Sequence, residues 1–304
     1  MNAADVALWL TFGLLGVAIA AVWLSPLKVA RTVSIAPWMM FFAMATASGV
    51  AAGFVSPAGV LALLVFAGMA HLSSAERFGR IWRTIFGIVT AFLALALALH
   101  KLPGFNNPQL IANVCFSRDA VPYTQYANFD KASVGLILLA FLCPRAATAA
   151  DGRALLRRTL PVAAVTLVVV MAVAMAMGVV RPQFKWPAYT LVFLATNLLF
   201  TCVAEEAFFR GFVQNRLAAA WPANHGWQML VLALSAALFG LAHLGGGPAY
   251  ALLATVAGLG YAYAFHVTGR IEAAIFTHFA FNAIHFVAFT YPAIAARTAA
   301  VSPA

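Results

Sequence analysis

The feature that most constrains the fold is a series of long apolar runs along the chain. The run from Val6 to Leu24 holds no charged residue, and neither does the run from Ala188 to Ala204. A helix needs about 20 mainly apolar residues to cross the hydrocarbon core of a bilayer, and it satisfies its backbone hydrogen bonds within one segment. The pattern predicts an all-α fold, a polytopic transmembrane helical bundle with about 9–10 spans.

The apolar runs also give the positions of the expected spans. These are residues 6–24, 36–53, 57–73, 81–100, 133–149, 159–180, 188–219, 227–244, 248–267 and 271–290. The fifth is the weakest, because its uninterrupted apolar run, Val134 to Cys143, is too short to cross alone and is followed by Pro144. The first has no basic residue before it and no small-residue cleavage site after it, so we expect a first span and not a cleaved signal peptide.

Composition and charge support the same class of protein. Hydrophobic residues make up 64% of the chain and charged residues only 9%, against roughly 25% charged in an average soluble domain. The formal charge of +10 is spread between the apolar runs and forms no single basic patch, which argues against nucleic acid as a partner. On the ten-span assignment twelve basic residues lie on one side and six on the other. This bias predicts a cytoplasmic face for the side with twelve basic residues and external termini. We expect an integral, multi-pass protein of the cell (plasma) membrane.

The chain has one long polar connection and one expected boundary. Residues 101–132 are rich in Pro, Asn and aromatic residues, which indicates an ordered external or interfacial loop. A boundary near Asp151–Arg158 would divide the chain into an N-terminal transmembrane helical region of unknown role, 1–150, and a C-terminal core, 151–304. Cys115, Cys143 and Cys202 are far apart and form no C-x-x-C pair, so we expect neither a disulfide framework nor a thiolate zinc site.

Two adjacent acids, Glu205 and Glu206, follow the uncharged run from Ala188 to Ala204 and precede Arg210. Ionisable groups inside a membrane are costly and usually face the interior of the bundle or a wet cavity. At about 100° per residue, Arg210 lies on the side of Glu206 and away from Glu205, so Glu206 and Arg210 are expected to form a structural i,i+4 ion pair. Glu205 has no cation in its own helix to compensate it, and a carboxylate in such a place can act as a general base or acid.

Two histidines lie close to this pair in sequence and each has a polar or aromatic companion. His243 follows Phe239 by one turn, and His278 precedes Asn282 by one turn on one face of the last span. The other histidines have simpler interpretations: His71, His100 and His266 as packing residues and His225 as a loop residue, with the role of His285 open.

Three motifs in this order resemble those of a known family. Glu205-Glu206-x-x-x-Arg210, Phe239-x-x-x-His243 and His278-x-x-x-Asn282 are similar to the motifs of the CPBP family, the CAAX prenyl endopeptidases and bacteriocin-processing or immunity proteins that are also called the ABI family. The resemblance covers roughly residues 155–290. It implies an intramembrane endopeptidase that depends on glutamate and acts on membrane-associated substrates of the CAAX type or the leader-peptide type.

The resemblance also implies roles for the motif residues. Glu205 would activate water with help from His243, and His278 with Asn282 would stabilise the oxyanion. Glu206, Arg210 and Phe239 would support the site. The implied partners are a peptide or protein substrate in the membrane and the lipid bilayer, and no cofactor is expected.

Two other functions remain open from the residues. The two glutamates and two histidines suit zinc or another divalent metal, which would make a metal-dependent membrane protease, although the motif H-E-x-x-H is absent. The same polar cluster could serve ion or partner binding in a non-catalytic immunity or transport component.

Overall fold

The computed structural model describes residues 3–28, 34–220 and 224–295. The end of the expected C-terminal core, 296–304, lies outside the described residues. Within them, eight helices are long and apolar enough to cross a membrane. The predicted all-α bundle is therefore confirmed, with two fewer long helices than the upper estimate of ten.

The helices of the first half carry the chain from the N-terminus to the middle of the bundle. They are α1 (Ala3–Ala20), η1 (Ala21–Trp23), α2 (Pro37–Ala51), α3 (Pro57–Ser74), α4 (Arg80–Ala98) and α5 (Phe129–Leu142). The strands of this half form two antiparallel pairs, β1 (Leu27–Lys28) with β2 (Ser34–Ile35) and β3 (Gln109–Val114) with β4 (Tyr123–Tyr126). The second pair lies in the predicted polar loop 101–132.

The helices of the second half begin after Pro144 and include the motif-bearing segments. They are α6 (Ala149–Ala176), α7 (Thr190–Thr196), η2 (Asn197–Cys202), α8 (Val203–Glu206), η3 (Ala207–Gln214), α9 (Asn215–Ala220), α10 (His225–Ala242), η4 (Leu244–Gly246), α11 (Pro248–Thr268) and α12 (Ile271–Ala288).

Two of the expected spans are shorter helices. The segment 36–53 forms α2, with 15 residues, and the segment 133–149 forms α5, with 14 residues. α5 ends at Leu142 because Pro144 disfavours helical geometry in the residue before it. Most of its side chains are buried, and an apolar helix of this length is typical of the core of a bundle. α5 is thus an internal helix rather than a lipid-facing one.

A single long helix carries the two adjacent glutamates. The segments from α7 to α9 run without a break over Thr190–Ala220, which is 31 residues. The sequence predicts one regular helix here, but η2 and η3 are π-helical turns on either side of α8. Such wide turns occur often at functional sites, and here they flank Glu205 and Glu206.

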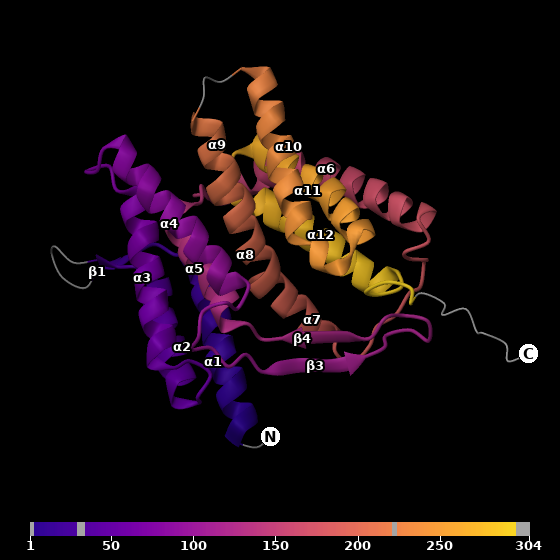
Figure 1. Ribbon diagram of the computed structural model, residues 1–304, viewed down its shortest axis with the longest axis horizontal. Coiled ribbons are helices and arrows are strands. Elements are labelled where there is room, and N and C mark those ends of the chain that lie inside the picture. The colour runs from indigo at the N-terminus through magenta and orange to yellow at the C-terminus, as the bar shows by residue number, and fades with distance from the viewer. Residues whose placement is uncertain (1–2, 29–33, 221–223, 296–304) are drawn as a thin grey trace, which may run out of the picture.

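The long helix lies between the two halves of the bundle. Figure 1 shows α1–α5 on one side of it and α6, α10, α11 and α12 on the other, with the β3–β4 hairpin across one end. α5 packs against α8 from the first side, and η3 packs against α10 and α11 on the second. The glutamates therefore occupy the junction of the two halves.

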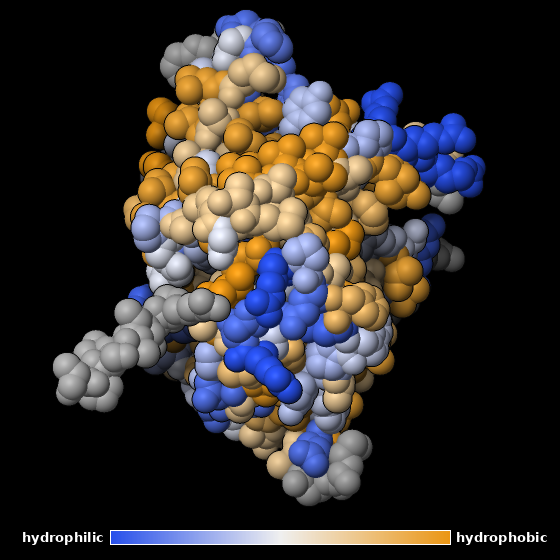
Figure 2. Space-filling model, turned by 90° about the vertical axis from the view of Figure 1, so that its right-hand side faces the viewer, coloured by the Kyte–Doolittle hydropathy of each residue, from blue (hydrophilic) through white to orange (hydrophobic). Residues whose placement is uncertain are grey.

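The outer surface has the apolar character that a bilayer requires. Large apolar side chains such as Ile81, Phe92 and Leu191 are 76%, 70% and 71% exposed. Figure 2 shows that apolar side chains cover a large continuous part of the visible face, with hydrophilic side chains gathered elsewhere on it. With the eight candidate spans, this makes the chain an integral, multi-pass membrane protein.

Candidate active site

Glu206 and Arg210 form a fully buried ion pair at the centre of the bundle. Both side chains are 0% exposed, and Arg210 Nη1 donates to Glu206 Oε1 over 3.2 Å. Arg210 Nη2 also donates to the backbone oxygen of Gly258 on α11 over 2.9 Å, and the guanidinium lies 4.6 Å from the ring centre of Phe239 on α10. Arg210 thus ties the long helix to both α10 and α11, as the sequence predicts for a structural pair.

His278 extends this pair toward the cavity. Its Nδ1 lies 2.7 Å from Glu206 Oε1. If Glu206 is ionised it can only accept, so Nδ1 is the donor, which orients the ring and leaves Nε2 as the second polar atom. The ring of Tyr261 stacks on the imidazole with centroids 4.5 Å apart. The position of His278 is therefore fixed from two directions.

Glu205 faces away from that pair and has two partners of its own. Its Oε1 accepts a hydrogen bond from Lys131 Nζ over 2.7 Å, and its Oε2 lies 3.9 Å from His243 Nε2. The helix that bears Glu205 supplies no cation for this carboxylate, as the sequence indicates, but another helix does. The cation comes from α5, more than seventy positions earlier in the chain, and considering only the helix that bears Glu205 could not reveal it.

His243 is oriented by its own helix end. It follows the last residue of α10, and its Nδ1 lies 2.7 Å from the backbone oxygen of Phe239. A carbonyl oxygen only accepts, so Nδ1 donates, and the neutral ring then presents Nε2 as an acceptor toward Glu205. Phe239, expected to support the site, does so through its backbone as well as through its ring against Arg210.

Asn282 is placed one turn beyond His278, as the sequence predicts. Its Nδ2 donates to Asn197 Oδ1 over 3.1 Å, and Asn197 also accepts from the thiol of Cys202 over 3.3 Å. These contacts join α12 to the π-helical segment η2. Nδ2 also lies 3.8 Å from Cys202 Sγ, a weak acceptor for the second N–H of the amide.

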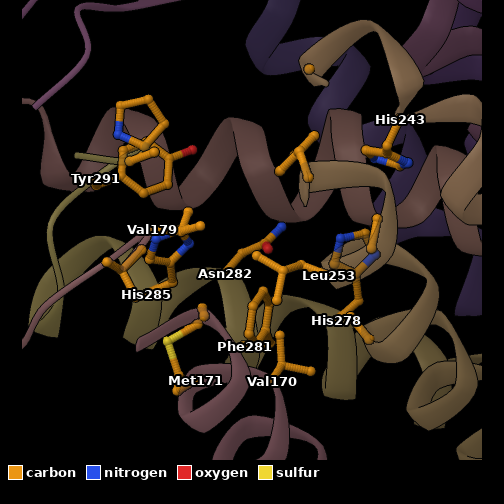
Figure 3. A pocket seen from close by; sticks show the side chains of 18 of the residues that line it. Val170, Met171, Val179, His243, Leu253, His278, Phe281, Asn282, His285 and Tyr291 are labelled. Carbon is orange, nitrogen blue, oxygen red and sulfur yellow. The ribbon is translucent and has the colours of Figure 1, made fainter. Parts of the chain in front are cut away.

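Glu205, His243, His278 and Asn282 line one cavity of about 540 Å³. Figure 3 shows His243 at one end of this cavity and Tyr291 at the other, with Asn282 between them. The rest of the wall is mostly apolar and comes from α6, α11 and α12, with Val170, Leu253 and Phe281 as examples. All four residues that the sequence assigned to chemistry are thus brought to one space, although their catalytic roles stay predictions.

The far end of the cavity is aromatic. Tyr123 of β4, Tyr291 and His285 line it, and the rings of Tyr123 and Tyr291 are 5.1 Å apart. Burial raises the pKa of both Tyr123 and Tyr291, so these phenols stay neutral at ordinary pH. His285, whose role the sequence left open, belongs to this end of the cavity.

Several site residues were missed by sequence reasoning. Lys131, Asn197 and Tyr261 each contact a predicted residue. Asn197 and Tyr261 are polar positions in apolar helices, which is a weak indication of a function. Lys131 lies in the segment 101–132, which the sequence predicts to be an external or interfacial loop, and nothing in its local sequence indicates that it reaches Glu205.

A metal site is not apparent from the donors. In the parts of the chain that the structure describes, no three His, Cys, Asp or Glu side chains are grouped as metal ligands. Glu206 is bonded to both Arg210 and His278, and Glu205 to Lys131. These ionic partners compete with a cation for the carboxylates.

Comparison with known protein families identifies the segment that holds this site. Residues 186–284 match the family described as type II CAAX prenyl endopeptidase Rce1-like. This segment is similar to an Rce1-like domain. The match includes Glu205, His243, His278 and Asn282, and it confirms the resemblance drawn from the three motifs over a narrower range than 155–290.

The Rce1-like domain covers α7 to most of α12, and the remainder of the chain lies outside it. Comparisons with curated proteins and with solved structures gave no match. The family supports a membrane-embedded protease of the CAAX type. The division of the chain at residues 150 and 151 stays a prediction.

Proposed function

We propose that the protein is an intramembrane endopeptidase in which Glu205 and His243 activate a water molecule to hydrolyse a peptide bond of a membrane-associated substrate. The observation that carries this proposal is the separation of 3.9 Å between Glu205 Oε2 and His243 Nε2. It is too long for a direct hydrogen bond and suits two acceptors that share one water molecule.

The orientation of His243 supports water activation. Because Nδ1 donates to the oxygen of Phe239, Nε2 accepts, and so does Glu205 Oε2. A water that donates one hydrogen to each atom directs its lone pairs away from them and toward the cavity. Glu205 takes the proton as the water attacks the carbonyl carbon, and it later supplies a proton to the departing amine.

His278 and Asn282 are suited to the developing negative charge on the carbonyl oxygen. Both line the same cavity as Glu205. Beyond its bond to Asn197, the Asn282 amide has a second N–H whose partner, Cys202 Sγ at 3.8 Å, is a weak acceptor that a substrate oxygen can replace. His278 can donate from Nε2 when protonated, and Glu206, bonded to its Nδ1, stabilises that form. Donors held in advance where charge develops provide the electrostatic part of catalysis.

The family match makes a prenylated peptide that ends in a CAAX sequence the first substrate to test, with a leader peptide as the second. The cavity is mostly apolar around a few polar groups, which suits a peptide with a lipid attached. Proteolysis by two glutamates and two histidines on a metal is the alternative chemistry. The ion pairs of both carboxylates support the metal-independent form.

The experiment compares the membrane proteomes of cells that carry the wild type or Glu205→Gln. The substitution is nearly isosteric but removes the base, so a substrate processed by wild type alone would establish proteolysis and identify the peptide. Glu76→Gln, the same change at an exposed position, is the control and should process as wild type does. Normal processing by Glu205→Gln would refute the assigned role of Glu205.

A further inference from the structure

A second cavity shares Glu205 and His243 with the first. It has a volume of about 260 Å³ and is bounded by α4, α5, the long helix and α10. Glu205 and His243 line both cavities, whereas Lys131 is part of the wall of the second. Lys131 therefore approaches the pair from the second cavity and not from the proposed substrate side.

Lys131 meets Glu205 in largely apolar surroundings. Apart from Lys131, Glu205 and His243, the described wall of the second cavity consists of alanine, leucine, valine and phenylalanine side chains. The side chains of Lys131 and Glu205 are only 20% and 14% exposed. Charge-assisted hydrogen bonds are strong, and more so where water is scarce. The bond of 2.7 Å thus fixes Oε1 of the carboxylate firmly.

The first turn of α5 is itself held in place. The carboxylate of Asp130, 1% exposed, accepts from Asn107 Nδ2 over 3.0 Å and lies 2.7 Å from His100 Nδ1. Asn107 Oδ1 accepts in turn from the backbone N–H of Phe129 over 2.9 Å. The backbone N–H of Lys131 also donates to Asp130 Oδ1 over 2.9 Å. These bonds anchor the residues on either side of Asp130, so the backbone of Lys131 has little freedom to move.

Close helix packing brings Lys131 within reach of Glu205. Gly135 lies one turn after Lys131 on the same face of α5. A Cβ atom at Gly135 would lie 2.7 Å from Cα of Ala204, the residue before Glu205. Backbones that approach this closely require a glycine. α5 and α8 therefore touch directly beside the carboxylate.

We propose that Lys131 is a positioning residue for the hydrolytic reaction: it holds Oε1 of Glu205 from the second cavity, so that Oε2 faces His243 and the attacking water in the first. This inference rests on the proposed function. It assigns the first half of the chain, outside the Rce1-like domain, a part in the reaction through α5. Lys131 keeps its protons throughout, and the proton from water is taken by Oε2.

The test measures release of the C-terminal tripeptide from a farnesylated peptide that ends in a CAAX sequence, with the purified full chain in lipid nanodiscs. Lys131→Met is expected to lower kcat by about 100-fold, the scale of loss when a reacting group is misplaced by about 1 Å, with KM unchanged. Lys131→Gln should behave in the same way. Lys131→Arg keeps a cation and should recover about ten-fold or more of the loss.

Lys101→Met, the same substitution at an exposed lysine, is the control and should leave kcat and KM as in wild type. Wild-type kcat or a higher value in Lys131→Met, while Glu205→Gln is inactive, would overturn the inference and leave the proposed function intact. A loss that Lys131→Arg does not relieve would also overturn it, because a merely structural contact would explain that result. An active Glu205→Gln would refute the proposed function itself, because it would remove the base that the proposal assigns.

Discussion

Replacement of Arg210 by methionine should destabilise the protein strongly. Among the arginine and lysine side chains that the structure describes, Arg210 is the one that pairs with Glu206. Glu206 is 0% exposed, and removing one partner of a buried ion pair typically costs about 3–5 kcal/mol. His278 contacts Glu206 over 2.7 Å, and this contact does not depend on Arg210, so we expect a loss near the lower end. Methionine retains apolar bulk beside Phe239, so the cost of a cavity stays small.

The expected loss of unfolding free energy for Arg210→Met is therefore about 3 kcal/mol, to which the lost hydrogen bond from Arg210 to the backbone oxygen of Gly258 adds about 1 kcal/mol. The assay is reversible unfolding in mixed micelles, followed by circular dichroism. Arg157→Met, at an exposed position of α6, is the matched control and should change stability by less than about 0.5 kcal/mol.

A double variant isolates the charge. Arg210→Met combined with Glu206→Gln removes both charges and leaves an amide oxygen for His278, so it should regain about 2 kcal/mol relative to Arg210→Met alone. Double-variant stability equal to or below that of Arg210→Met would refute the argument that the buried carboxylate is the source of the loss.

Three further predictions concern the site and its support. Gly135→Ala should lose about 1–3 kcal/mol of unfolding free energy and lower kcat, because its Cβ would lie 2.7 Å from Cα of Ala204. Gly68→Ala is the control, since a Cβ there meets nothing within 4 Å, and equal effects of the two changes would contradict the packing argument. Asn282→Ala should lower kcat by about 10²–10³-fold if its amide stabilises the oxyanion, and an unchanged kcat on the farnesylated peptide would remove it from that role. A membrane-permeant chelator should leave activity unchanged, whereas loss that zinc restores would establish the metal-dependent alternative.

The sequence was sufficient for much of the site because its residues stand out against an apolar background. Polar groups are expensive inside a membrane, so Glu205, His243, His278 and Asn282 are visible in the sequence without any coordinates. The spacing of Glu206 and Arg210 also predicts that these two residues pair, since residues four apart share a helix face. That pair persists although η3 is π-helical, because its contact joins neighbouring turns.

The sequence could not predict the length and environment of α2 and α5. Both are apolar, and hydropathy does not distinguish a lipid-facing helix from one buried in protein. Pro144 ends α5 early, and the surrounding helices bury it. Only the packing of the whole bundle decides this, as it decides the wide turns that flank α8.

The sequence by itself determined that this protein is a helical membrane bundle and that Glu205, His243, His278 and Asn282 lie inside it, since hydropathy and helical periodicity are local properties of the chain. Only the tertiary structure decided which of these residues meet. Glu205 pairs with Lys131 because Gly135 lets α5 approach α8, and His278 turns to Glu206 because α12 packs against the long helix. Contacts between distant segments depend on how side chains fill the space between helices, and no local pattern encodes that geometry.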